Sequence, residues 1–288
     1  MLRSLIAQDA AVARVGYRLA IANRDLCPRT APLPGFLAHS PSQYAPEYRA
    51  DLREVAGLFS GFGIAAVIDG SPAERAGLRA GDILLKIEGE AIDSPKAAKA
   101  DYGPVEALNA RLDEAMADDM LELAVLHRDG TQQTLSVRPD TGCAVQFQVT
   151  GGKGWDAATD GRIVTLQSGI VAAAANDAEL AVTLAHELAH VVYRDPERVG
   201  PNPAGGREAR ADVIGQYLMA RAGYDAGAAA TFWARYGDSH PLDFLGTTGG
   251  HASPKARTRR ASETAADIAR LQAAGTELWP EDYAPPGS

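Results

Sequence analysis

The sequence is poor in cysteine and lacks any long apolar run. Two cysteines in 288 residues are too few for a fold stabilised mainly by disulfides. No stretch approaches the roughly 20 apolar residues of a membrane-spanning helix, so we expect no transmembrane segment. Polar residues such as Arg3 and Asp9 interrupt residues 1–13, which therefore do not form the hydrophobic part of a signal peptide. We expect either a cytoplasmic protein or a mature form whose leader is not part of this chain.

Positive charge is also scarce. The 28 Lys and Arg residues are outnumbered by 37 Asp and Glu residues, which gives a net charge of −9. Such a chain is poorly suited to phosphate backbones or anionic lipid surfaces, so we expect no nucleic-acid or membrane partner. A glycine-rich stretch at 151–156 lacks the Gly-Lys-Ser/Thr and the strand-loop-helix context of a phosphate-binding loop, which excludes that kind of nucleotide site.

The first 54 residues predict one helix and an extended connector. Apolar residues recur at helical spacing over 2–23, and Cys27-Pro28 ends the helix because proline disfavours helix in the residue before it. A proline-rich segment follows. The length of the whole chain permits one large or two modest domains. We expect residues 1–54 to pack on the last domain of the chain.

Short apolar runs broken by glycine begin near Val55. They lead into Ser71-Pro72-Ala73, then Ala76-Gly77-Leu78, then Gly81-Asp82-Ile83-Leu84. This series resembles the PDZ domain of the bacterial high-temperature-requirement proteases, over about 55–139. The resemblance implies a β-rich domain whose groove binds the C-terminal ends of peptides as an added strand.

The resemblance also suggests where the parts of this domain lie. The loop Gly61-Phe62-Gly63-Ile64 is expected to hold the peptide carboxylate, because its glycines can turn backbone N–H groups towards an anion. A groove-lining helix is expected at 104–116. A closing hairpin is expected at 121–127 and 133–137, where Asp129-Gly130 is a strong turn signal.

A metal-binding pattern lies within residues 180–192. It reads His186-Glu187-Leu188-Ala189-His190. Residues four apart share one face of a helix, so the two histidines can aim their rings at one point with Glu187 beside it. This pattern is typical of a zinc site in which the glutamate is the general base for a water that the metal activates. We therefore expect one catalytic Zn²⁺.

A catalytic zinc ion needs a third protein ligand. The astacin-like class takes a histidine six residues after the second one, but that position is Pro196. The other main class takes a glutamate from a following helix, which leaves Glu197, at a helix end that points away from the site, and Glu208. We predict Glu208 as the ligand. Asp212, four residues later on the same face, is predicted to accept the N–H of a ligand histidine.

The spacing Glu208-x-x-x-Asp212 after this motif resembles the gluzincin peptidases of the CAAX prenyl protease and HtpX family, over about 143–271. Residues 161–170 are similar to the family's edge strand and the helix behind it. His251, Ser253 and Arg257 are similar to its late His-Pro-Ser…Arg motif, with Ala252 in place of the proline. The resemblance implies that His251 is a donor near the oxyanion and that Arg257 supports the metal carboxylates.

The two cysteines, Cys27 and Cys143, bracket the domain at 55–139. A disulfide between them would tie the N-terminal helix to the last domain while the intervening domain forms a loop. Such a bond implies an oxidising compartment, the bacterial periplasm or cell envelope. The alternative is two free thiols in a cytoplasmic protein.

Together these patterns predict an α+β protein with a helical zincin-type metalloprotease domain at 140–288, a small edge sheet and an inserted PDZ domain. We expect a zinc-dependent endopeptidase acting on protein or peptide substrates, with the substrate strand pairing near 162–166. The alternative is a PDZ peptide-binding scaffold with a latent or structural zinc site. No pattern indicates the substrate, the PDZ ligand or the oligomeric state.

Overall fold

The computed structural model describes residues 2–58, 60–95, 98–197, 206–239, 252–284 and 286. The chain is a mixed helix-and-sheet protein with two compact units: Met1–Tyr17 with Pro32–Thr141, and Arg18–Ala31 with Gly142–Ser288. Three elements contain residues of both units, namely helix α1 (Leu2–Ala22) and the paired strands β1 (Thr30–Leu33) and β8 (Asp140–Cys143). No helix in the described part of the chain is both long and apolar enough to cross a membrane.

The first unit is built on an antiparallel sheet with the strand order β2-β3-β4-β6-β7, and β5 pairs with β4. The strands are β2 (Phe36–His39), β3 (Phe62–Val67), β4 (Ile83–Ile87), β5 (Glu90–Ala91), β6 (Leu121–Leu126) and β7 (Gln132–Val137). The helices are α2 (Pro46–Ala56), α3 (Pro72–Arg75) and α4 (Gly103–Ala115), with short turns η2 (Pro41–Gln43) and η3 (Met116–Asp118). The predicted groove helix and closing hairpin agree with α4, β6 and β7 to within one residue.

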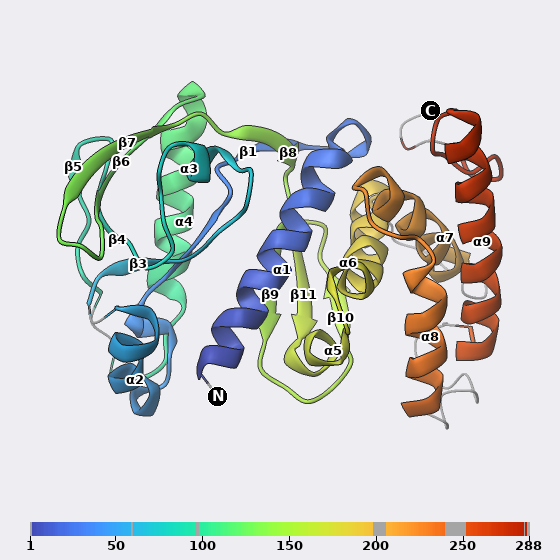
Figure 1. Ribbon diagram of the computed structural model, residues 1–288, viewed down its shortest axis with the longest axis horizontal. Helices are drawn as coiled ribbons and strands as arrows, with labels where there is room; N and C mark the ends of the chain where they lie inside the picture. The colour runs from blue at the N-terminus through green and yellow to red at the C-terminus, as the bar shows by residue number, and fades with distance from the viewer. Residues whose placement is uncertain are drawn as a thin grey trace. The chain divides into compact units, whose positions relative to one another are not determined.

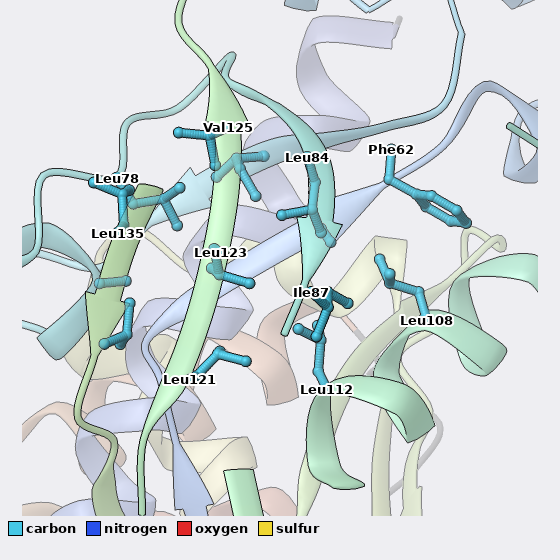
Figure 2. Packing of buried hydrophobic residues seen from close by; sticks show 14 of the residues in the cluster. Phe62, Leu78, Leu84, Ile87, Leu108, Leu112, Leu121, Leu123, Val125 and Leu135 are labelled. Atoms are coloured by element: carbon cyan, nitrogen blue, oxygen red, sulfur yellow. The ribbon is translucent and has the colours of Figure 1, made fainter. Parts of the chain in front are cut away.

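The core of the first unit contains residues of both the sheet and α4 (Figure 2). Along β6, Leu121, Leu123 and Val125 are fully buried while Glu122 is exposed, the period-2 alternation of a sheet with one covered face. Leu108 and Leu112 of α4 belong to the same buried cluster. This packing sets the register of the sheet, because a shift by one residue would turn the buried leucines outward.

The sheet of the first unit begins earlier in the chain than expected. Strand β2 comes from the proline-rich segment predicted as an extended connector, and it pairs with β3 through Phe36–Val67 and His39–Gly63. Gly35 precedes β2 with φ +84°, and a Cβ at this position would lie 2.2 Å from Cβ of Ser71. Only glycine therefore allows this close approach.

The second unit joins a three-stranded sheet to a group of helices (Figure 1). The sheet has the order β10-β11-β9, with β9 (Gln146–Thr150), β10 (Ala157–Thr159) and β11 (Ile163–Gln167). The helices are α5 (Ser168–Ala173), α6 (Asp177–Val192), α7 (Gly206–Arg221), α8 (Ala228–Ser239) and α9 (Pro254–Ala274), with turns η1 (Arg24–Leu26) and η4 (Asp195–Glu197). Helix α6 packs on α7, and α8 packs on α9.

Helix α6 begins at a side-chain cap, Asn176. The side chain of Asn176 accepts the backbone N–H of Glu179 at 3.0 Å, and the Glu179 carboxylate accepts the backbone N–H of Ala175 at 2.7 Å. Arg235 of α8 also donates to Glu179, with Nη1 at 2.9 Å from Oε1. These contacts fix the start of α6 against α8 and so limit any sliding of the helix.

The segment 18–31 lies against the far end of α7. Arg221 donates from Nε to Oδ1 of Asn23 at 3.0 Å, and its Nη2 is 2.6 Å from Oδ2 of Asp25. Cys27 and Cys143 form the predicted disulfide, with Cα atoms 5.5 Å apart. Both cysteines belong to the second unit, and the segment Pro32–Thr141, the larger part of the first unit, lies between them in the chain.

We expect that replacing both cysteines, Cys27→Ser with Cys143→Ser, lowers the free energy of unfolding of the second unit by about 4–5 kcal/mol. The reason is that the bond links residues 116 positions apart and restricts the unfolded chain. Denaturant unfolding measures the change. The prior control is the intact mass after alkylation without reductant, where two alkylated cysteines in the unsubstituted protein would contradict the bond.

Candidate metal centre

Helix α6 carries two histidines on one face. The Nε2 atoms of His186 and His190 are 3.3 Å apart, and the ring centroids are 4.9 Å apart. His186 is 6% exposed and Glu187 is 7% exposed. Because Leu184 and Leu188 are fully buried on the same helix, α6 is a core helix whose polar side chains face an internal site.

Helix α7 brings carboxylates to these histidines. Oε2 of Glu208 lies 3.2 Å from Nε2 of His186 and 3.6 Å from Nε2 of His190. The approach of the two helices depends on Gly215, where a Cβ would lie 3.0 Å from the backbone nitrogen of His186. Any side chain at this position would push α7 and its carboxylates away from α6.

The separations of the three ligand atoms fit a tetrahedral metal ion. Bonds of about 2.0–2.1 Å at tetrahedral angles place the ligand atoms about 3.3 Å from one another. The observed separations are 3.2, 3.3 and 3.6 Å. Within the described residues, His186, His190 and Glu208 are the one group of His, Cys, Asp or Glu that could hold a metal ion. Two imidazoles and one carboxylate form a donor set that zinc uses with a further position open.

The outer nitrogen of each histidine contacts an aspartate. Nδ1 of His186 is 3.0 Å from Oδ1 of Asp212, and Nδ1 of His190 is 2.9 Å from Oδ2 of Asp195. A carboxylate only accepts hydrogen bonds, so each neutral imidazole carries its proton on Nδ1 and directs the lone pair of Nε2 towards Glu208. Two lone pairs and a carboxylate oxygen therefore converge, and such a group of acceptors requires a cation.

The pKa values agree with this need for positive charge. Burial lowers the pKa of His190, but the contacts with Asp195 and Glu208 outweigh burial and raise it to about 9. Burial raises the pKa of Glu208, but its hydrogen bonds with the two histidines hold that pKa well below its usual range. A proton and a metal ion would thus compete for the same point.

Glu187 differs from its neighbours. Burial raises the pKa of Glu187, and the nearby histidines oppose this shift only in part. A carboxylate with a raised pKa is better suited to take up a proton near neutral pH and to release it again. Glu187 also lines the cavity beside His190, so its carboxylate is placed where a reacting molecule would enter.

A cavity of about 300 Å³ opens beside two of the three ligand candidates, His190 and Glu208. One wall is strand β10, with Ala157, Ala158 and Thr159, and the other includes Glu187, His190, Asp195, Pro196, Arg207 and Glu208. The small side chains of β10 leave room for the side chains of a bound molecule. The cavity is therefore bordered by a strand on one side and by candidate metal ligands on the other.

The strand that borders the cavity is not the one expected. The predicted edge strand, 162–166, corresponds to β11, which is central: it pairs with β10 on one side and with β9 on the other. Strands β10 and β9 are the outer strands, and β10 is the one that borders the cavity. The prediction was wrong because Ala157-Ala158-Thr159 is too short and too weakly β-forming to stand out in the sequence.

Two residues of the late motif, His251 and Arg257, have a predicted role, and the structure describes only Arg257. His251 lies outside the described residues. Arg257 is 8% exposed, and its Nε donates to Oδ2 of Asp212 at 3.0 Å while its guanidinium carbon lies 3.2 Å from the ring centroid of Trp233. Arg257 is thus buried against Asp212, which is also the partner of His186. Its direct partner is this aspartate and not Glu208, the predicted metal ligand.

Sequence reasoning missed the partner of His190. Glu197, two residues after Asp195, was predicted to lie at a helix end that points away from the site. In the structure, Arg194 has φ +53° and turns the chain back, so that Asp195 in η4 reaches Nδ1 of His190. The available signal was Asp195 itself, an acidic residue five positions after the candidate ligand His190.

Three of the four residues of the predicted carboxylate loop, Phe62, Gly63 and Ile64, lie in strand β3, while Gly61 precedes the strand with φ +73°. Gly63 stands opposite His39 of β2 and Ile83 of β4, and the backbone N–H of Ile64 donates to the carbonyl of Asp82 at 2.8 Å. These groups are therefore engaged within the sheet. Among the described strands of this sheet, β2 and β7 are the two outer ones. An added strand could use either edge, and the edge of β2 is the candidate nearer to the predicted loop because β2 pairs with β3.

Comparison with known proteins finds one protein family. Residues 63–100 match the family model of the PDZ domain, so the first unit contains a PDZ domain, a peptide-binding module. The matched residues include most of β3, the short helix α3 and strands β4 and β5, and they end before α4. No curated protein matches the chain.

Solved structures also resemble this part of the chain. One is the crystal structure of the HtrA3 PDZ domain bound to a phage-derived ligand, FGRWV, with 20% identity, a TM-score of 0.29, and coverage of 39% of this chain and 89% of that chain. Another is the HtrA-type protease AlgW with a decapeptide, with 23% identity, a TM-score of 0.26, and coverage of 39% of this chain and 29% of that chain.

The outer edge of β2 is where we expect a peptide to bind to the first unit. Titration with a peptide selected from a C-terminal peptide library should shift the amide NMR signals of Phe36 and Ala38 in β2, because the backbone groups of the alternate residues Gly35, Leu37 and His39 face β3. The other outer strand, β7, exposes Gln132, Gln133 and Thr134 and serves as the control that should not respond. Shifts confined to Gly61–Ile64 would contradict the assignment.

Proposed function

We propose that this protein is a zinc-dependent endopeptidase of the gluzincin type that carries a PDZ domain for peptide binding. The observation that supports the proposal most is the convergence of the Nε2 atoms of His186 and His190 with Oε2 of Glu208, beside Glu187. A structural zinc site is normally closed by four protein ligands, whereas this group offers three and borders a cavity.

Zinc would be held by His186, His190 and Glu208, and it would supply Lewis-acid activation of water and of the scissile carbonyl. Glu187 would accept a proton from the attacking water as its oxygen bonds to the carbonyl carbon. Glu187 would then give that proton to the amide nitrogen as the C–N bond breaks, which leaves a carboxylate and an amine. His251 is proposed as a donor to the developing oxyanion on the strength of the family resemblance.

The substrate backbone is proposed to pair with β10. This strand is an outer strand of its sheet and forms one wall of the cavity that contains Glu187 and His190. An extended peptide added there would present its amide bonds to the ligand group, as β-augmentation does elsewhere. The reaction therefore requires an extended or unfolded segment, which suits a peptide or a loosely structured protein as the substrate.

The disulfide indicates the kind of compartment in which the protein acts. Cys27 and Cys143 are paired, and such bonds persist in oxidising compartments. We infer that the protein acts in the bacterial periplasm or cell envelope. In that setting the PDZ domain would bind C-terminal or extended peptide segments of the proteins that the second unit cleaves.

The variant Glu187→Gln is expected to bind zinc as the unsubstituted protein does and to lose hydrolysis almost completely, because the amide cannot take up the proton. Zinc content by elemental analysis and cleavage of a peptide library with and without a chelator measure the two properties. Glu197→Gln, an exposed glutamate of η4, is the matched control and should remain active. Unchanged cleavage by Glu187→Gln would refute the mechanism.

The same experiment tests the second candidate function. Zinc in the protein without cleavage of any library peptide would favour a PDZ peptide-binding scaffold with a latent or structural zinc site. Absence of zinc from a protein purified and reconstituted with zinc would refute the metal centre itself.

A further inference from the structure

Each candidate ligand histidine in the second unit contacts an aspartate, that aspartate contacts an arginine, and the arginine lies over an aromatic ring. The first series joins His186 to Asp212, Asp212 to Arg257, and Arg257 to the face of Trp233. The aspartate and the arginine in this series are each 9% exposed at the side chain. We call this series the Arg257 arm.

The second series has the same order of residue types. Nδ1 of His190 contacts Asp195 at 2.9 Å, and Nη2 of Arg210 contacts both carboxylate oxygens of Asp195, at 2.5 and 2.6 Å. The guanidinium carbon of Arg210 lies 4.2 Å from the ring centroid of Tyr193. The side chains of Asp195 and Arg210 are 6% and 17% exposed. We call this series the Arg210 arm.

The geometry of the Arg210 arm leaves Asp195 little freedom. Both oxygens of the carboxylate contact one guanidinium, while Oδ2 also accepts from His190. The guanidinium in turn lies over the ring of Tyr193, whose face attracts a cation. The hydroxyl of Tyr193 donates to the backbone carbonyl of Ala284 at 2.8 Å, which fixes the ring from its outer side.

A short turn would otherwise be a poor support for a metal ligand. Asp195 lies in η4, a turn of three residues that follows the end of α6, and not in a long helix. Its position relative to His190 is therefore not set by helical geometry. Arg210 projects from α7, the helix that also carries Glu208, so it ties the turn to the element that supplies the third ligand. The arm thus links two of the three ligands.

We propose that Arg210 and Tyr193 are positioning residues that hold Asp195, and through it the ring of His190, in the orientation that binds zinc. This inference rests on the proposed function, because it concerns the same metal centre. Neither residue touches the ligand atoms. Their effect acts on the affinity and the geometry of the metal, as is known for partners of metal-bound histidines.

The test is the zinc affinity of the full chain, measured by competition with a chromophoric chelator. Arg210→Met should weaken binding by about 10- to 100-fold. Arg210→Lys should recover part of the loss, because it restores the charge but not the planar contact with the ring. Tyr193→Leu, which removes the ring, should also weaken binding, whereas Tyr193→Phe should stay close to the unsubstituted protein.

A matched control separates positioning from general stability. Arg221 lies on the same helix and forms an ion pair with Asp25, far along α7 from the ligands. Arg221→Met should leave zinc affinity unchanged whatever its effect on the unfolding temperature of the metal-free protein. The visible spectrum of the Co²⁺-loaded protein gives a second readout: it should change in Arg210→Met and not in Arg221→Met, since only the first alters the ligand geometry.

The outcomes are distinct. If the unsubstituted protein binds no zinc, the proposed function and this inference both fail. If it binds zinc and Arg210→Met binds equally tightly with the same Co²⁺ spectrum, only the positioning role fails. Should Arg210→Met not fold, Tyr193→Leu and Asp195→Asn decide the question, and unchanged zinc affinity in both would overturn the inference.

Discussion

Three electron pairs directed at one point are the constraint around which the second unit is arranged. The Nε2 atoms of His186 and His190 and Oε2 of Glu208 lie within 4.8 Å of one another in a largely buried site. Acceptors at such distances repel unless positive charge lies between them. The close approach of α7 at Gly215 and the aspartate at each Nδ1 serve to keep these atoms in place. The site is therefore held in a form that favours binding a cation.

The part of the site that sequence reasoning predicted is the part that local geometry determines. His186 and His190 are four residues apart on one helix, so their common direction follows from helical periodicity alone. Glu208 lies on another helix, and it was predicted because Pro196 excludes the astacin-like class and because Asp212 follows it by four residues on the same face. A role for Arg257 was implied only by the family resemblance, and its partner in the structure is Asp212.

What sequence reasoning missed depends on contacts between distant residues. The hairpin of β6 and β7 was predicted because Asp129-Gly130 defines its turn locally, and Gly130 indeed has φ +85°. Strands β2 and β10 have no such signal, since four and three residues respectively carry little periodicity. Both are outer strands, and which strand lies outermost is decided by pairing across the sheet. The edges where a peptide could add were therefore the least predictable part of the fold.

The disulfide and the paired strands explain how one unit can be inserted into another. The chain passes between the units at three points, 17/18, 31/32 and 141/142. Cys27 and Cys143 lie on the second-unit side of the last two points, where β1 pairs with β8. The two ends of the inserted segment are thus held together by the second unit itself. Residues 18–31 are held to the rest of the second unit by the disulfide and by the contacts of Arg221 in α7 with Asn23 and Asp25.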